Sequence, residues 1–178
     1  VAPEAKAAID EKEGIEFLHH RLVYGLGAIL ADDMGLGKTL QTLALLGSMK
    51  CDKTAIVVAP ASVVYVWLDE AKKFMPDLKV AVIAGNKKQR DKVLRVQSSY
   101  DLLITSYHLV RNDLDSFISM DFSLVILDEA QVIKNPAAKI TKAVKRLRSD
   151  HRLALSGTPV ENRLTDLWSI FDFLNPGF

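Results

Sequence analysis

The sequence has little cysteine, no long hydrophobic run and almost no net charge. A single cysteine, Cys51, in 178 residues excludes an intrachain disulfide and a zinc site built from several cysteines, and it fits a reducing intracellular compartment. The longest apolar run, Leu22 to Ala31, is interrupted by glycines and is too short to span a membrane. The formal net charge of +1 gives no overall argument for a nucleic-acid or membrane partner.

What the sequence does have is an ordinary globular composition with alternating strand and helix patterns. The hydrophobic share of 49% and the charged share of 25% predict one domain with a substantial core. Short apolar runs predict strands at 27–31, 54–59, 79–84, 101–105, 122–127 and 152–155. Apolar residues at helical spacing separate these runs. Because parallel strands need crossover connections, the pattern predicts an α/β fold, a largely parallel sheet with helices on both faces.

The first predicted strand leads into a loop that is typical of a phosphate cradle. In Asp32 to Thr39 (DDMGLGKT), glycines let backbone N–H groups approach phosphate oxygens, Lys38 can reach the outer phosphates and Thr39 can ligate magnesium. The strict pattern has a glycine at the position of Asp32, so a chance glycine-bearing turn is the alternative. The predicted nucleotide-binding residues are Asp33, Met34, Gly35, Leu36, Gly37, Lys38 and Thr39.

Two adjacent carboxylates follow the strand predicted at 122–127. Asp128 can hold magnesium directly or through water, and Glu129 can orient and deprotonate the water that attacks the γ-phosphate. An exposed acidic pair at the start of a helix is the alternative. Further polar groups at the same predicted edge of the sheet could sense the γ-phosphate; they are Gln131, Ser156, Gly157 and Thr158.

Evidence for nucleic-acid binding is local and indecisive. Residues 139–152 hold six basic side chains and one acidic one, which a solvated helix face explains almost as well as a binding surface. The charged helix predicted over residues 87–96 is also expected to be solvated. Backbone amides and hydroxyls at Ser62, Thr105 and Ser106 could contact phosphates without reading base sequence. The residue chemistry therefore leaves nucleic-acid binding open.

Taken together, these segments resemble the Swi/Snf-type ATPases of helicase superfamily two, the motors of chromatin remodellers and of bacterial relatives. The matching motifs, in order, are GAILADDMGLGKTLQT, IVVAPASVVYVW, ITSYHLVR, LVILDEAQVIKNP and LALSGTPVENRLTDLWSIFDFLNP. Asp32, which departs from the strict phosphate-loop pattern, is the residue that this family has there. The resemblance implies a RecA-like, ATP-binding lobe over residues 14–178, preceded by an N-terminal extension of residues 1–13.

The resemblance also implies a function and a set of site residues. It implies a DNA-dependent ATPase that translocates on double-stranded DNA and remodels protein–DNA complexes, with ATP and Mg²⁺ as cofactors. Lys38, Asp128 and Glu129 would be catalytic, Thr39 and Asp128 would bind the metal, and Gln131, Ser156, Gly157 and Thr158 would couple hydrolysis to movement. The implied DNA contacts are Pro60, Ser62, Gly85, Asn86, Thr105, Ser106, Tyr107, Lys134 and Asn135.

The same resemblance sets expectations for partners and location. Further partners would be a second RecA-like lobe of the same parent chain and a nucleosome or RNA polymerase, with no membrane involved. The protein would be intracellular, in the nucleus of a eukaryote or the cytoplasm of a prokaryote.

Two departures from the family pattern qualify these expectations. Glu11 stands where the family has an adenine-reading glutamine, and a carboxylate can only accept hydrogen bonds, which leaves adenine selectivity open. The sequence as far as Phe178 matches only the first lobe. The second lobe carries the family's arginine fingers, which are worth roughly 10³ to 10⁵ in rate in related enzymes. Without them, the isolated chain is expected to turn over ATP very slowly. Alternatives are a lobe of another superfamily-two helicase or restriction-type translocase, and a catalytically silent docking module.

Overall fold

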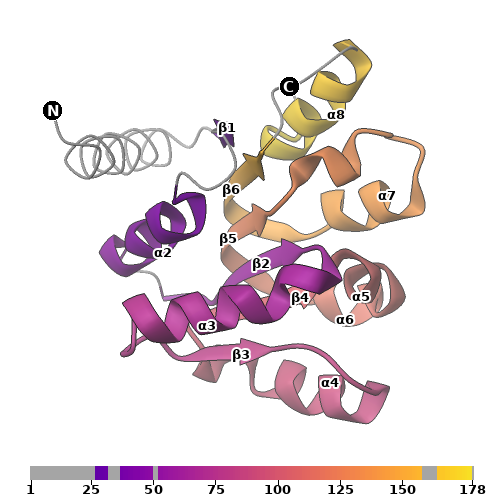
Figure 1. The fold of residues 1–178 in the computed structure, drawn as a ribbon. Coiled ribbons are helices and arrows are strands. Elements are labelled where there is room, and N and C mark those ends of the chain that lie inside the picture. The colour runs from indigo at the N-terminus through magenta and orange to yellow at the C-terminus, as the bar shows by residue number, and fades with distance from the viewer. Residues whose placement is uncertain (1–26, 32–36, 50–51, 158–163, 178) are drawn as a thin grey trace, which may run out of the picture.

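The computed structural model describes residues 27–31, 37–49, 52–157 and 164–177 (Figure 1). Several predicted features therefore lie outside the described residues. They are the N-terminal extension of residues 1–13 with Glu11, the phosphate-loop residues Asp32, Asp33, Met34, Gly35 and Leu36, and Thr158.

A six-stranded sheet forms the centre of the molecule, in the order β1-β6-β5-β2-β4-β3. Every neighbouring pair is parallel, which confirms the predicted α/β class. β2, for example, is buried at all five positions, as expected of a parallel strand covered on both faces. The strands are β1 (Ala28–Ala31), β2 (Ala55–Ala59), β3 (Val80–Val82), β4 (Leu102–Ser106), β5 (Asp121–Leu127) and β6 (Arg148–Ser156).

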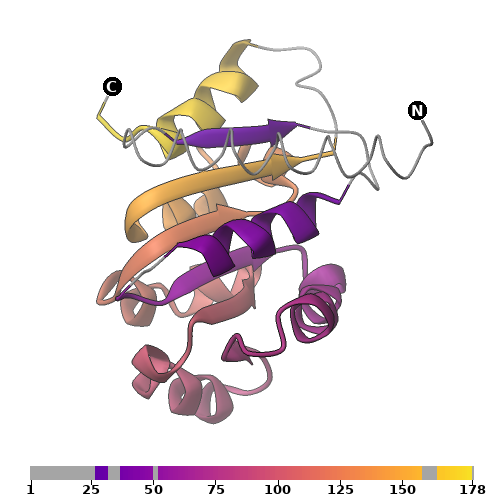
Figure 2. The same ribbon diagram turned by 90° about the vertical axis from the view of Figure 1, so that its left-hand side faces the viewer.

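Helices pack on both faces of this sheet, as predicted. The α-helices are α2 (Lys38–Ser48), α3 (Val64–Phe74), α4 (Lys87–Arg95), α5 (Tyr107–Asn112), α6 (Leu114–Ile118), α7 (Lys139–Lys145) and α8 (Leu164–Leu174), and the 3₁₀ helices are η1 (Ala61–Val63), η2 (Gln97–Ser99) and η3 (Ala130–Ile133). One core contains buried residues of α2 and α3, and the other contains residues of α4 to α8. Figure 2 shows α2 in front of the sheet and β1, β6 and β5 in their pairing order.

β6 and α7 differ from their predicted bounds. β6 begins at Arg148 instead of residue 152, because its first residues pair with the start of β5, with Arg148 opposite Asp121. α7 correspondingly ends at Lys145, where the predicted helix over the basic segment 139–148 gives way to the strand. The six basic side chains of this segment are therefore divided between a helix, a turn and a strand.

The basic segment is also largely occupied by contacts within the chain. Lys145 Nζ lies 2.8 Å from Asp172 Oδ2, and Arg148 Nε lies 3.0 Å from Asp121 Oδ1. Arg152 is buried and donates to the carbonyl oxygens of Phe173 and Leu147. These contacts favour a structural role for these three residues.

No helix in the described part of the chain is both long enough and apolar enough to span a membrane.

Candidate functional site

The predicted site residues meet at one edge of the sheet, at the carboxyl ends of three neighbouring strands. β1 precedes α2, Asp128 follows β5, and Ser156 ends β6. Register places Ala31 beside Ser156 and Leu127 beside Ala154. Groups that come from separate motifs are thereby brought to the crevice where open parallel sheets bind ligands.

The described end of the predicted phosphate loop forms the N-terminus of α2. Gly37 has φ 76° and ψ 20°, a left-handed conformation that suits glycine. Gly37 is the N-cap residue, so no side-chain hydrogen bond caps this helix. Lys38 and Thr39 are the first two residues of the helix. The helix is held from within, since Thr42 Oγ1 donates to the carbonyl oxygen of Lys38 at 2.8 Å. A helix start of this kind offers backbone N–H groups and partial positive charge to an anion.

Asp128 is fixed by hydrogen bonds from three parts of the chain. Its Oδ2 accepts from Trp67 Nε1 at 2.8 Å, and its Oδ1 accepts from the backbone N–H of Glu129 at 2.9 Å. Its backbone oxygen accepts from the Tyr107 hydroxyl at 2.7 Å. Its own N–H donates to the carbonyl of Val58 in β2 at 2.9 Å. Both the side chain and the main chain of Asp128 are therefore held in one arrangement.

Burial raises the pKa values of Asp128 and Tyr107. Desolvation raises the pKa of Asp128 above its ordinary value, while the hydrogen bond from Trp67 acts in the opposite direction. The charge of Glu129 also raises the pKa of Asp128, and the positive charge of Lys38 lowers it. Burial raises the pKa of the Tyr107 phenol well above its ordinary value, so this hydroxyl stays protonated and remains a donor.

A second chain of hydrogen bonds links Glu129 to the end of β6. Gln131 Nε2 donates to Glu129 Oε2, and Ser156 Oγ donates to Gln131 Oε1 at 3.2 Å. Glu129 is held at φ 52° and ψ 55°, a left-handed conformation that costs a non-glycine residue about 1–3 kcal/mol and is common at functional sites. Glu129, Gln131 and Ser156 thus lie together as the sequence predicts, with Gly157 following directly along the chain.

The residues present suit a magnesium ion that is bound jointly with a nucleotide. The hydroxyl of Thr39 and the carboxylate of Asp128 are hard oxygen donors, which Mg²⁺ prefers. Among the residues that the structure describes, no three His, Cys, Asp or Glu side chains form a metal cage. A site with one carboxylate and one hydroxyl fits the usual mode of Mg²⁺, which takes its other ligands from phosphate and water.

The predicted DNA contacts divide into exposed and buried groups. Pro60 is partly exposed, and five further residues, Ser62, Gly85, Asn86, Lys134 and Asn135, are exposed. The remaining three, Thr105, Ser106 and Tyr107, are buried. The Tyr107 hydroxyl is engaged by Asp128, and Thr105 Oγ1 donates to the Ile83 carbonyl at 3.3 Å. Any contact from the buried group to an outside ligand would therefore use the main chain.

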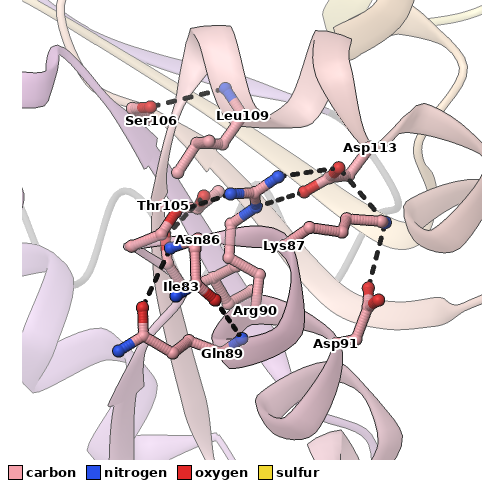
Figure 3. Close-up of polar contacts among 11 residues, drawn as sticks. Ile83, Asn86, Lys87, Gln89, Arg90, Asp91, Thr105, Ser106, Leu109 and Asp113 are labelled. Atoms are coloured by element: carbon pink, nitrogen blue, oxygen red, sulfur yellow. Dashed lines mark hydrogen bonds and ion pairs between the residues drawn. The ribbon is translucent and has the colours of Figure 1, made fainter.

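A polar cluster that sequence reasoning missed joins the Gly85–Asn86 turn to Asp113, the residue between α5 and α6 (Figure 3). The Arg90 guanidinium donates to both carboxylate oxygens of Asp113 and to the Gly85 carbonyl. Lys87 adds an ion pair to Asp113 at 3.2 Å. The hydrogen bond from Arg90 lowers the pKa of Asp113. The helix predicted to be simply solvated therefore directs two side chains, Arg90 and Lys87, toward Asp113 at the end of α5.

The cluster also shapes the turn before α4. Gly85 has φ +82°, and a Cβ there would lie 2.3 Å from Gln89 Oε1. Asn86 caps α4 by accepting from the Gln89 N–H at 3.0 Å, and the Gln89 side chain accepts from the Asn86 N–H. Asn86 followed three residues later by Gln89 is a capping-box pattern, so the sequence contained this signal. It contained no equivalent signal for the pairing of Arg90 with Asp113.

Comparison with known proteins connects this geometry to characterised relatives. A family model for the SNF2-related domain matches residues 10–178. The chain is 41% identical to the TATA-binding protein-associated factor mot1 of Schizosaccharomyces pombe, covering 94% of this chain and 9% of that protein. It is 42% identical to the putative ATP-dependent helicase/translocase YwqA of Bacillus subtilis, covering 100% of this chain and 20% of that protein. The chain thus spans a fifth or less of these relatives.

Solved structures agree with the sequence matches. The Sulfolobus solfataricus SWI2/SNF2 ATPase core in complex with dsDNA superposes with a TM-score of 0.86 at 42% identity, covering 94% of this chain and 35% of that one. The same ATPase core domain in a second structure gives a TM-score of 0.78 at 41% identity, covering 94% and 34%. These matches confirm the predicted RecA-like fold and the predicted family. The chain belongs to the SNF2-related family, whose model covers it from residue 10 to residue 178.

Proposed function

We propose that this chain is the first ATP-binding lobe of a DNA-dependent ATPase that translocates on double-stranded DNA and remodels protein–DNA complexes. The observation that carries the proposal is the meeting of three polar groups at one sheet edge. They are the N-terminus of α2, the clamped carboxylate of Asp128, and the hydrogen-bonded series of Glu129, Gln131 and Ser156. Relatives named as an ATP-dependent helicase/translocase and a dsDNA-bound ATPase core support it.

The residues divide the work of binding and hydrolysis. Residues 33–39 cradle the phosphates of ATP, with Lys38 balancing the charge of the outer phosphates. Thr39 and Asp128 hold Mg²⁺, which when bound neutralises charge that develops on the β- and γ-phosphates. Glu129 orients the attacking water and takes its proton. The raised pKa of Asp128 is a property of the chain without the cation, and Mg²⁺ would favour the ionised form.

The proposed coupling between ATP hydrolysis and movement begins at Glu129, the residue that activates the attacking water. Gln131 contacts Glu129 on one side and Ser156 on the other, so a change at the γ-phosphate can be transmitted from β5 to the end of β6. Ser156, Gly157 and Thr158 then carry the signal away from the nucleotide. The left-handed backbone of Glu129 is the kind of local strain that such sites use.

DNA contacts fall to the exposed loops beside this edge. Pro60, Ser62, Gly85 and Asn86, together with Lys134 and Asn135, present polar or backbone groups at the surface. The buried residues Thr105, Ser106 and Tyr107 contribute through their main chain. Phosphate contacts of this kind position a duplex without reading base sequence, which is what a translocase requires.

A second RecA-like lobe of the same parent chain completes the ATP site. This chain covers about a third of the archaeal ATPase core to which it is similar, and the arginines of a second lobe would add roughly 10³ to 10⁵ in rate. The isolated chain therefore binds ATP weakly and turns it over very slowly. The parent acts on a nucleosome, RNA polymerase or another DNA-bound protein, in the nucleus of a eukaryote or the cytoplasm of a prokaryote.

Two substitutions in the two-lobe parent test these roles. Lys38→Ala removes the phosphate-binding cation and Glu129→Gln removes the base, so both are expected to lower DNA-stimulated ATP hydrolysis by at least about 10²-fold. The Glu129→Gln protein should still bind ATP in a calorimetric titration, because its phosphate loop is intact. Normal turnover in either variant would refute the assignment. Lys72→Ala, which changes an exposed lysine of α3 outside every proposed binding site, is a control that should retain the DNA-stimulated rate.

A further inference from the structure

Two buried aromatic side chains contact Asp128 from different helices, and neither has been assigned a role at the nucleotide site. Trp67 comes from α3 and is 1% exposed. Tyr107 begins α5 and is 3% exposed. Each uses its single polar hydrogen on the same residue, Trp67 Nε1 at 2.8 Å from Oδ2 and Tyr107 Oη at 2.7 Å from the backbone oxygen.

The two hydrogen bonds have different geometric effects. The bond from Trp67, with that from the Glu129 N–H to Oδ1, fixes the orientation of the carboxylate plane. The bond from Tyr107 fixes the peptide that joins Asp128 to Glu129, at the point where Glu129 takes its left-handed conformation. One aromatic residue thus controls the side chain, and the other controls the main chain leading to the next acid.

Packing makes these donors rigid. Trp67 belongs to the core on the α2 and α3 face of the sheet, and Tyr107 belongs to the core on the opposite face. Asp128 is therefore held between two cores, by side chains that cannot leave without opening one of them. A buried indole N–H or phenol hydroxyl usually has a hydrogen-bond partner, and an acceptor on any residue would satisfy that requirement. Burial alone therefore does not explain why both donors bond to the same residue, Asp128.

We infer that Trp67 and Tyr107 are positioning residues of the magnesium–nucleotide site, which present the Asp128 carboxylate to the N-terminus of α2 in one orientation. The inference rests on the proposed function, because it assigns these residues to the cation that Asp128 would hold. Partners of this kind orient metal ligands, and their loss typically lowers metal affinity about 10- to 100-fold.

The test removes each hydrogen bond while retaining the aromatic ring. Trp67→Phe deletes the indole N–H, and Tyr107→Phe deletes only the hydroxyl. The chain supplies matched controls on its surface, Trp168→Phe and Tyr65→Phe, since these residues are 62% and 59% exposed. All four proteins are compared with the unmodified chain at a temperature well below every thermal midpoint, so that differences in folding do not enter.

The first readout is calorimetric binding of ADP with and without Mg²⁺. For Trp67→Phe we expect the factor by which Mg²⁺ strengthens ADP binding to fall about tenfold, while affinity for metal-free ADP changes less than about twofold. Tyr107→Phe should show a smaller loss of the same kind, and both controls should match the unmodified chain. An unchanged magnesium effect in Trp67→Phe would overturn the inference. Failure of the unmodified chain to bind ADP at millimolar concentration would instead count against the proposed function.

A second readout needs no nucleotide. The two tryptophans give two indole N–H signals in an NMR spectrum, and the substitutions above assign them. We expect the Trp67 signal to exchange slowly with solvent and to exchange at least about tenfold faster in Asp128→Ala, because alanine has no side-chain acceptor for the indole N–H. The Trp168 signal should exchange quickly in both proteins. An exchange rate of the Trp67 signal that is the same in Asp128→Ala as in the unmodified chain would overturn the inference.

Discussion

At the scale of single residues, the ion pair of Arg90 and Asp113 is a contact whose loss should measurably lower the stability of the fold. The Asp113 side chain is 3% exposed and that of Arg90 is 12% exposed. Removing the carboxylate leaves the Arg90 charge with only the Gly85 carbonyl as its described partner, and breaking buried pairs of this kind costs about 3–5 kcal/mol. We expect Asp113→Asn to lower the free energy of unfolding by about 3 kcal/mol in a urea titration.

A nearby acid provides the control for this prediction. Asp115 lies two residues further along and is exposed, so Asp115→Asn should change stability by less than about 0.5 kcal/mol. Equal urea midpoints for the Asp113 and Asp115 variants would show that the ion pair of Arg90 and Asp113 in Figure 3 does not stabilise the fold.

The same pair should make stability depend on acidity. Hydrogen bonding from Arg90, helped by Lys87, lowers the pKa of Asp113 in the folded chain. A lowered folded-state pKa means that the contribution is complete above the unfolded pKa of about 3.9. It is lost as the pH falls through the lower, folded-state pKa. The stability gap between the unmodified chain and Asp113→Asn should therefore narrow as the pH drops below about 4, and a gap that widens there would contradict the prediction.

Sequence reasoning grouped the site residues well, because it needed only their place in the fold. Asp128, Glu129 and Ser156 each follow an apolar run, and parallel strands bring such positions to one edge. The contact of Trp67 with Asp128 could not be predicted in the same way. An apolar stripe on a helix shows that Trp67 is buried, but the acceptor depends on how α3 packs against the end of β5.

At the scale of elements, the ends of a strand could be predicted from the sequence where the strand coincides with a run of apolar residues. The apolar runs that became β2 and β4 were found almost to the residue. The first half of β6 was missed because Arg148, Ser149, Asp150 and His151 have no strand pattern of their own. They extend the strand by pairing with β5, which is a tertiary effect.

The contact between β1 and α8 yields a prediction about a glycine. A Cβ on Gly27 would lie 2.6 Å from the Leu174 carbonyl oxygen and 2.7 Å from the Leu174 Cβ. Because these are a backbone atom and the first side-chain atom, α8 itself must shift. We expect Gly27→Ala to lower the free energy of unfolding by about 1–3 kcal/mol, measured as a reduced urea midpoint.

Gly47 is the matched comparison within the same chain. A Cβ there would meet only the terminal methyl of Met75, at 2.3 Å, and that flexible side chain can move aside. Gly47 also lies inside α2, where alanine is favoured by about 0.5–1 kcal/mol. Gly47→Ala should therefore be neutral or stabilising. Loss of stability in Gly47→Ala equal to that in Gly27→Ala would show that the packing of α8 on β1 is not the cause.

At the scale of the whole molecule, the class of fold was predictable and the strand order was not. Alternating apolar runs and helical patterns require a parallel α/β sheet, whatever the order of its strands. Paired residues of β1 and β6, such as Ala28 and Leu153, are 125 positions apart in the sequence, and nothing in their local sequence selects one partner over another. The order β1-β6-β5 is nevertheless what brings the end of β1, Ser156 and the acidic pair to neighbouring positions.

Under the proposed function, this chain would be one lobe of a motor and would hold only part of its ATP site. The nucleotide edge of this chain offers a helix N-terminus, two carboxylates and a coupling series. We assign the arginines that stabilise the transferred phosphate to a second lobe. On that account this chain supplies the phosphate-binding groups, the magnesium ligands and the base, and rapid turnover requires the second lobe as well.

The most direct measurement is the ATPase rate of the two-lobe parent with equal concentrations of duplex DNA, single-stranded DNA and RNA. The account predicts that duplex DNA stimulates hydrolysis most, by at least about tenfold over the rate without nucleic acid, and that Glu129→Gln abolishes the stimulated rate. Equal or greater stimulation by single-stranded DNA or RNA would favour a strand-separating helicase. No ATP hydrolysis under any of these conditions would contradict the central claim and favour a docking module.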